Sequence, residues 1–326
     1  MNTNVKTELL RRMSAGKEHP VSGQQLADEF GVSRTAIWKY VKELETEGYE
    51  IGSVRKKGYY LIASPDAVTP AAIQQYLTTP LYGSTIRYTG TCPSTQLIAH
   101  DEAQNGAADG TVIIADEQTA GKGRLSRPWS SAAGKGIWMS VITRPALTPQ
   151  QAPQMTLVTA VAIVRAIEEC TSVTPSIKWP NDILVNGRKL TGILTELQAD
   201  PDRVKAIILG IGMNVNQEPD DFPSELQSIA TSLRIEEGQP VSRAKLVAAV
   251  LSYLEQYVSL YVEKGFAPLK LLWESYADSI GRRIRVSTLQ ETYEAVARGI
   301  SDDGRLEVQL DDGTIRGIYS ADIHII

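Results

Sequence analysis

The sequence predicts a multidomain α+β chain with an N-terminal winged helix-turn-helix, a central α+β domain and a small C-terminal β-barrel. Its 326 residues exceed the usual size of one domain. Two helices joined by a tight glycine turn precede residue 48, and short alternating strands separated by Asp-Asp-Gly turns begin at Arg282. The predicted parts are residues 1–63, a linker with a short helix at 64–80, residues 81–277 and residues 278–326.

Composition argues against several classes of protein. No long uncharged apolar run indicates a membrane span or a signal peptide, so we expect a soluble, cytoplasmic protein with no membrane partner. Cys92 and Cys170 lie far apart and form no Cys-x-x-Cys pair, which argues against a disulfide framework or a zinc site. His19, His100 and His324 are scattered, so no metal cluster and no Ser/His/Asp triad is expected.

Charge is distributed unevenly along the chain. The whole chain has a net charge of −5, whereas residues 1–63 hold ten Lys or Arg and eight Asp or Glu, a net charge of +2. The basic excess therefore lies at the N-terminus. Because it is small, a case for nucleic-acid binding there depends on the fold and on local clusters.

Periodicity predicts three helices and a wing in the N-terminal domain. The first helix spans residues 3–14, and the second, at 22–31, begins at an N-cap serine and ends at a glycine. The third spans 34–48, and residues 49–62 indicate a two-stranded wing with a basic tip. The apolar side of the third helix is expected to consist of Ile37, Trp38, Val41 and Leu44.

A recognition helix beside a basic wing suits DNA. The start of the helix would reach bases or backbone, and the wing would contact phosphates. A winged-helix module that binds another protein is the alternative. The predicted DNA contacts are Gln24, Arg34, Thr35, Lys39, Arg55, Lys56 and Lys57.

The central domain is expected to begin with a strand at 86–89 and a helix at 92–105. Ser94 and Thr95 are either caps of that helix or ligand contacts. A long amphipathic helix at 148–171 should cover one face of a sheet.

A glycine-rich basic loop at residues 116–131 is the most informative stretch. It joins predicted strands at 111–115 and 136–143, and this context excludes dinucleotide-binding and P-loop motifs, which need a helix after the loop. Gly121 and Gly123 allow close approach to the backbone, while cations suit carboxylate or phosphate. The alternative is a mobile, solvated surface loop. The cations are Lys122, Arg124 and Arg127.

Residues 176–197 follow as antiparallel strands with an Asn-Gly hairpin turn. The hairpin brings Asp182 and Lys189 into one neighbourhood, although a lone lysine there is usually only solvated. Residues 204–216 indicate a buried strand, and its two glycines fit a place where a ligand comes close.

Four motifs follow one another along this domain: Gln118-Thr-Ala-Gly-Lys-Gly-Arg124, Lys178-Trp-Pro-Asn-Asp182, Arg188-Lys-Leu-Thr-Gly192 and Gly210-Ile-Gly-Met-Asn-Val-Asn216. Together they resemble the bifunctional biotin protein ligases that also repress the biotin operon. The resemblance spans almost the whole chain. It implies that the central domain is a mixed-sheet, class II biotin/lipoate ligase-like domain, that the C-terminal barrel is SH3-like, and that residues 216–232 form a lid.

The resemblance implies a two-step reaction. The carboxylate of biotin attacks the α-phosphate of ATP, with Mg²⁺ on the triphosphate, and a lysine of the biotin carboxyl carrier protein domain then displaces AMP from biotinyl-5′-AMP. Both steps build up negative charge, so preorganised cations are the expected means of catalysis. Biotinyl-5′-AMP would also be the corepressor of a ligand-dependent homodimer on operator DNA.

The resemblance also implies residue roles, with no resident metal site. Lys189 would bind the carboxylate and stabilise the transition state, Arg124 would retain the intermediate, and Asp182 would assist the metal or the amine. Lys122 and Gln96 replace the Arg and Asn of the family pattern, and Lys122 loses a bidentate fork. The expected biotin contacts are Ser94, Thr95, Gln96, Gln118, Lys122, Gly123, Arg124 and Lys189, and the expected nucleotide contacts are Arg127, Trp129, Lys178, Asn181 and Asn214.

Two other functions remain open at this point. A lipoate or octanoyl transferase would share the central fold but is expected to lack the winged helix and the Lys-Trp-Pro-Asn-Asp segment. A ligand-sensing repressor without catalysis would have no need of Arg124 and Lys189.

Overall fold

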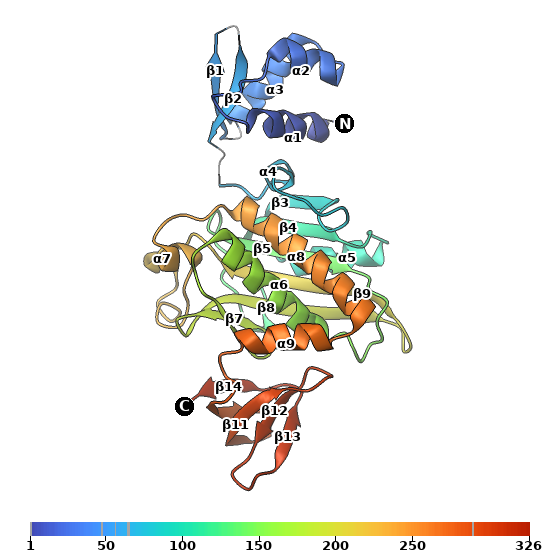
Figure 1. Cartoon of the computed structure of the whole chain (residues 1–326), viewed down its shortest axis with the longest axis vertical. Coiled ribbons are helices and arrows are strands. Elements are labelled where there is room, and N and C mark those ends of the chain that lie inside the picture. Colours follow the sequence, from blue (N-terminus) through green and yellow to red (C-terminus); the bar gives the residue numbers. More distant parts are fainter. Residues whose placement is uncertain (1, 47, 56, 64–65, 289) are drawn as a thin grey trace. The chain divides into compact units, whose positions relative to one another are not determined.

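The computed structural model divides the chain into two compact units, Met1–Leu77 and Thr78–Ile326 (Figure 1). No helix among the described residues is long and apolar enough to cross a membrane. The residues that the structure describes are 2–46, 48–55, 57–63, 66–288 and 290–326.

The first unit is a winged helix-turn-helix, as predicted. Between α2 and α3, Gly31 adopts the left-handed conformation (φ 64°, ψ 33°) and its N–H donates to the carbonyl of Ala27, which ends α2. Thr7 of α1 donates to the side chain of Gln74 in α4, so the short helix packs within this unit. Its elements are α1 (Asn2–Met13), α2 (Gly23–Phe30), α3 (Arg34–Thr46), β1 (Glu50–Val54), β2 (Gly58–Ala63) and α4 (Pro70–Gln74).

The apolar side of α3 differs from the prediction at one residue. Ile37, Val41 and Leu44 are buried in the core that α1, α2 and α3 share, as expected. Trp38, which was expected on the same side, is 50% exposed. The prediction for Trp38 was wrong because an indole was assumed to be buried, whereas its position on α3 lies at the border of the core.

A seven-stranded mixed sheet dominates the second unit, in the order β3-β4-β5-β9-β8-β7-β6, with only β3 and β4 parallel. The helix α5 packs on one face, while α6 and α8 lie against each other across the other face (Figure 1). The strands are β3 (Ile86–Cys92), β4 (Thr111–Gln118), β5 (Gly136–Thr143), β6 (Ser176–Lys178), β7 (Asp182–Val185), β8 (Arg188–Ala199) and β9 (Val204–Asn214). The helices are α5 (Thr95–Gln104), α6 (Gln154–Cys170), α7 (Leu233–Glu237), α8 (Arg243–Lys264) and α9 (Ala267–Tyr276).

Two helix starts differ from the prediction. The long helix α6 begins at Gln154 instead of residue 148, because turns occupy the preceding residues and the side chain of Gln151 accepts hydrogen bonds from Thr148. The helix α5 begins at Thr95 because the side chain of Ser94 accepts a hydrogen bond from the N–H of Gln96 and caps it.

The chain ends in a five-stranded antiparallel sheet with the order β13-β12-β11-β10-β14. Sequence periodicity predicts four of these strands and misses the last one, a four-residue strand at one edge. That strand matters because it reaches the pocket described below. The strands are β10 (Arg283–Ser287), β11 (Thr292–Ile300), β12 (Leu306–Gln309), β13 (Ile315–Ile318) and β14 (Asp322–Ile325).

The start of β2 makes a backbone contact that a side chain would break. Gly58 has φ +130°, and a Cβ there would lie 1.9 Å from the carbonyl oxygen of Val21. We therefore expect Gly58→Ala to destabilise the N-terminal unit by about 2 kcal/mol or more. Faster amide hydrogen exchange in α1–α3 would report the loss. Gly16→Ala is the matched control, since φ is +80° but no atom lies within 4 Å, and an equal effect of both variants would contradict the steric argument.

Candidate functional site

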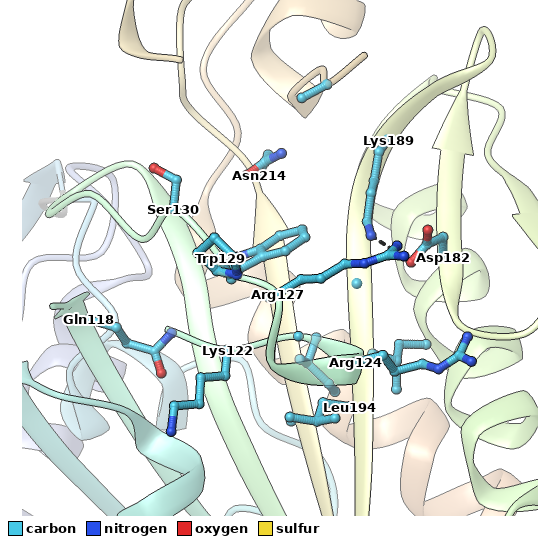
Figure 2. A pocket seen from close by; sticks show the side chains of 18 of the residues that line it. Gln118, Lys122, Arg124, Arg127, Trp129, Ser130, Asp182, Lys189, Leu194 and Asn214 are labelled. Carbon is cyan, nitrogen blue, oxygen red and sulfur yellow. Dashed lines mark ion pairs between the residues drawn. The ribbon is translucent and has the colours of Figure 1, made fainter. Parts of the chain in front are cut away.

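One pocket in the second unit, of about 300 Å³, gathers most of the residues predicted to bind ligand (Figure 2). That volume lies at the lower end of the range for small-molecule sites. Its walls come from the start of α5, the loop at 118–131, the central strands, the segment at 217–230 and Asp322 of β14. Segments far apart in the sequence therefore complete a single site.

The floor of the pocket is a patch of sheet without side chains. Gly192 of β8 pairs directly with Gly212 of β9, and Gly210 lies two residues away on the same face. A Cβ on Gly212 would lie 2.5 Å from the indole nitrogen of Trp129, and one on Gly210 would lie 2.6 Å from the side-chain oxygen of Gln96. Glycine at these two positions therefore leaves room for the side chains of Trp129 and Gln96, which lie flat on the strands.

The basic loop at 118–131 is a narrow hairpin between β4 and β5, as the strand pattern predicts. The N–H of Trp129 donates to the carbonyl of Gly121 (2.9 Å), and a Cβ on Gly121 would lie 2.6 Å from the carbonyl of Trp129. At the tip, Leu125 and Ser126 have φ values of 55° and 57°, a left-handed conformation that costs about 1–2 kcal/mol per residue. Other contacts must hold a tip of this shape.

Both arginines of the loop are held by side chains from outside it. Arg124 donates to Asn181 Oδ1 (3.0 Å) and to Ser320 Oγ (2.7 Å). Arg127 pairs with Asp322 (Nη2 to Oδ2, 2.6 Å). The hydrogen bond from Arg127 holds the pKa of the Asp322 carboxyl below its usual value, with further lowering by the charges of Arg127 and Arg124. The C-terminal segment thus neutralises Arg127 through Asp322, whereas Arg124 contacts only neutral oxygens.

Lys189 is held at the site through both its side chain and its backbone. Its Nζ lies 2.8 Å from Asp182 Oδ1 and 5.3 Å from the ring centroid of Trp129 (Figure 2). Its backbone N–H donates to the carbonyl of Ile229 (2.8 Å), and its carbonyl accepts from the N–H of Thr231 (2.9 Å). Side chain and backbone are therefore fixed by different segments.

A buried chain of polar side chains connects the pocket floor with the basic loop. Ser140 Oγ donates to Gln96 Oε1 (2.8 Å) and lies 2.9 Å from Thr95 Oγ1. Thr95 donates to Gln118 Oε1 from its N–H (2.8 Å), and Gln118 in turn donates to Ser131 Oγ (2.9 Å). The amide nitrogen of Gln96 bonds to strand carbonyls, so this side chain fixes its neighbours. The chain offers hydroxyl and amide groups at the pocket wall.

An ordered segment at 217–231 forms another wall, in the place predicted for a lid. Phe222, Leu226 and Ile229 line the pocket, and the side chain of Ile229 is 58% exposed. Asp221 is paired with Lys135 (2.8 Å). The segment therefore presents apolar side chains to the pocket and is anchored by an ion pair.

The structure gathers all but one of the predicted catalytic, biotin and nucleotide residues at the pocket. The exception is Lys178 of β6, whose charge acts on Asp322. Sequence reasoning missed Ser140 and Asp322. A serine within the apolar strand β5 was a usable signal for the first, whereas the sequence around Asp322 carried none. The residues brought together are Ser94, Thr95, Gln96, Gln118, Lys122, Gly123, Arg124, Arg127, Trp129, Asn181, Asp182, Lys189 and Asn214.

The predicted DNA contacts lie on the first unit. Arg34, Thr35 and Lys39 are exposed in the first two turns of α3, and Gln24 of α2 donates to Asp28 (2.8 Å). The wing residues Arg55 and Lys57 are exposed, and Lys56 lies outside the described residues.

Breaking the pair between Arg127 and Asp322 should loosen the loop. In Asp322→Asn we expect faster amide hydrogen exchange at residues 123–129. Because the pair is partly exposed, a double-mutant cycle with Arg127→Gln should give a coupling of about 1 kcal/mol or less. The unmodified chain should loosen in the same way as the pH falls through the lowered pKa of Asp322.

The control for this cycle is Asp312→Asn in a turn of the same C-terminal sheet, where the carboxylate accepts from the N–H of Thr314. It should leave exchange in the loop unchanged. Fully additive effects of the Asp322 and Arg127 variants would contradict the contact.

Family models match three parts of the chain. A model described as the Biotin/lipoate A/B protein ligase family matches residues 87–214. An HTH domain model matches residues 6–60, and a model of the Biotin protein ligase C terminal domain matches residues 279–325.

Individual proteins match over longer stretches. The Bifunctional ligase/repressor BirA of Bacillus subtilis is 47% identical over 325 residues, 100% of both chains. The protein of the same name from Escherichia coli is 28% identical over 99% of this chain and 98% of its own. A solved structure, the biotin protein ligase from Aquifex aeolicus in complex with biotin and ATP, matches with a TM-score of 0.65 and 29% identity, covering 74% of this chain and 100% of that one. The chain therefore belongs to the bifunctional ligase/repressor family of biotin protein ligases.

Proposed function

We propose that this protein forms biotinyl-5′-AMP from biotin and ATP, transfers biotin to a lysine of a biotin carboxyl carrier protein, and represses biotin genes through its N-terminal unit. The observation that carries the proposal is the convergence of Lys189, Arg124 and Arg127 on one pocket with a polar end and a glycine floor. The family membership and the relatives that bind biotin and ATP support it.

The two ends of biotin differ in chemistry, and so do the two ends of this site. The ureido ring needs hydrogen-bond partners, which the chain of Thr95, Ser140 and Gln118 supplies. The valerate carboxylate needs a cation, which is Lys189. A lipoyl ring has no polar groups that would bond to the polar end of the pocket. A sensor without catalysis would not require the cations. Biotin ligation therefore fits the site better than either alternative.

In the first step the cations offset developing negative charge. Lys189 orients the biotin carboxylate as the nucleophile, and Arg124 and Arg127 stabilise charge on the α-phosphate and the departing pyrophosphate. For this, the phosphate must replace Ser320 and Asp322 as partners of the arginines. Trp129 supplies an aromatic face for adenine, and Asn181 and Asn214 supply polar contacts.

Mg²⁺ would arrive with ATP as part of the substrate. Asp182, Asp221 and Asp322 line the pocket, but each is paired with a cation. Among the described residues, no group of three His, Cys, Asp or Glu could hold a metal ion. This fits Mg²⁺ bound mainly by phosphates with one or two carboxylates. Asp182 would be such a carboxylate, and it would also accept a proton from the incoming lysine amine.

The second activity belongs to the first unit. The exposed start of α3 and the basic wing would bind operator DNA. Biotinyl-5′-AMP would favour a homodimer and so place two recognition helices on one operator. The whole reaction would take place in the cytoplasm.

Loss of the Lys189 ammonium should abolish ligation. In Lys189→Ala, transfer of biotin to a purified carrier domain with Mg²⁺-ATP should fall by about 100-fold or more, because a charge that stabilises the transition state is missing. Lys205→Ala is the matched control, since this lysine on the neighbouring strand β9 pairs with Asp200 outside the pocket. Equal activity of the two variants would exclude the proposed role.

Loss of the Arg124 fork should release the intermediate. In Arg124→Gly the cation proposed to hold the phosphate is lost together with its contact to Asn181, so biotinyl-5′-AMP should escape and acylate lysines of a bystander protein. Bystander labelling is measured with a streptavidin blot against Arg144→Gly, a control outside the pocket. Labelling no stronger than that of the unmodified chain would refute retention by Arg124.

A further inference from the structure

The exposure of the Trp38 side chain requires an explanation. Its side chain is 50% exposed, whereas Trp138, Trp179 and Trp273 are 0–2% exposed. The core side of α3 is already filled by Ile37, Val41 and Leu44, so Trp38 is not needed to complete it. Trp offers a large apolar surface that gains free energy when a partner covers it.

The surroundings of Trp38 are cationic. Arg34 and Lys42 lie one turn before and one turn after it, and Lys39 is its neighbour in sequence. Lys42 is paired with Glu45, while Arg34 and Lys39 form no ion pair with any residue that the structure describes. The centre of a protein interface is depleted of lysine, so this setting fits a polyanion better than a protein surface.

The helix-turn-helix fold determines how the exposed face of α3 that carries Trp38 would contact DNA. In a helix-turn-helix the second helix enters the major groove and its first residues contact base edges. Trp38 is the fifth residue of α3 and lies on the same exposed stripe as Thr35. In the major groove the apolar group available to an indole is the C5-methyl of thymine.

We propose that Trp38 is a specificity-determining residue that packs against a thymine methyl in each half of the operator. This inference rests on the proposed DNA binding of the N-terminal unit and adds which residue reads sequence. Arg34 and Lys39 supply attraction to phosphates that is independent of sequence, and Trp38 supplies the preference for one base pair.

The test uses DNA selected by the protein itself. The full chain, with biotin and Mg²⁺-ATP, selects duplexes from a random pool, and affinities are measured for the selected duplex and for a shuffled one. Trp38→Ala should lower the ratio of the two affinities by about 10-fold or more and leave the salt dependence unchanged. Lys39→Ala, the matched control, should weaken both duplexes and reduce the salt slope by about 2, which is about 1 for each copy in the dimer.

Thymine is then replaced by deoxyuridine, which lacks only the methyl group, at each selected position in turn. Replacement at one position in each half of the operator should weaken binding by the unmodified chain and have no effect on binding by Trp38→Ala. Trp38→Phe, which keeps an aromatic face, should retain part of that sensitivity. Circular dichroism of each variant confirms that the helices are intact.

The outcomes separate the two proposals. If the unmodified chain selects a site and Trp38→Ala keeps the same affinity ratio and the same deoxyuridine sensitivity, the role of Trp38 is refuted while DNA binding stands. If the unmodified chain selects no sequence at all, both are refuted. Loss of dimerisation in Trp38→Ala without loss of deoxyuridine sensitivity would identify a contact between copies and would also overturn the inference.

Discussion

The backbone of Lys189 is the constraint on which the rest of the site depends. Its N–H and carbonyl bind Ile229 and Thr231, so the wall formed by residues 217–231 is attached to the strand that carries Lys189, the proposed catalytic cation. The same residue extends its ammonium between Asp182 and the face of Trp129. A shift of that wall would therefore shift Lys189, so the roles proposed for this residue and the position of the wall both depend on one residue of β8.

Three cations at the site are paired with carboxylates before any substrate arrives. Lys189, Arg127 and Lys135 each face a carboxylate, and Arg124 faces neutral oxygens. Under the proposed function, this pairing restricts the cations to few conformations close to the substrate phosphates, which would reduce the reorganisation that catalysis requires. Under the proposed function, ATP must compete with Asp322 for Arg127, and the C-terminal sheet would influence nucleotide affinity through this contact.

Local sequence patterns predicted much of the site but failed where segments that are distant in the sequence meet. The glycines of β8 and β9, the hairpin near Lys189 and the basic loop were all readable, because each follows from strand periodicity or turn chemistry. Asp322 was not readable, since a four-residue edge strand carries almost no periodic signal and its role depends on Arg127 nearly two hundred positions earlier. Trp38 was wrongly predicted to lie on the apolar side of α3, because the prediction relied on its residue type although its position lies at the border of the apolar face.

The glycine floor has a consequence for inhibition. Gly192 and Gly212 lie beneath the Trp129 indole and Gly210 lies beneath Gln96, so an inhibitor that stacks on Trp129 depends on glycines that cannot be replaced without cost. A new methyl group at Gly212 would collide with Trp129, and one at Gly210 would collide with Gln96. Resistance by substitution at the floor would thus displace Trp129 or Gln96 as well, and so would disturb the site that the inhibitor occupies.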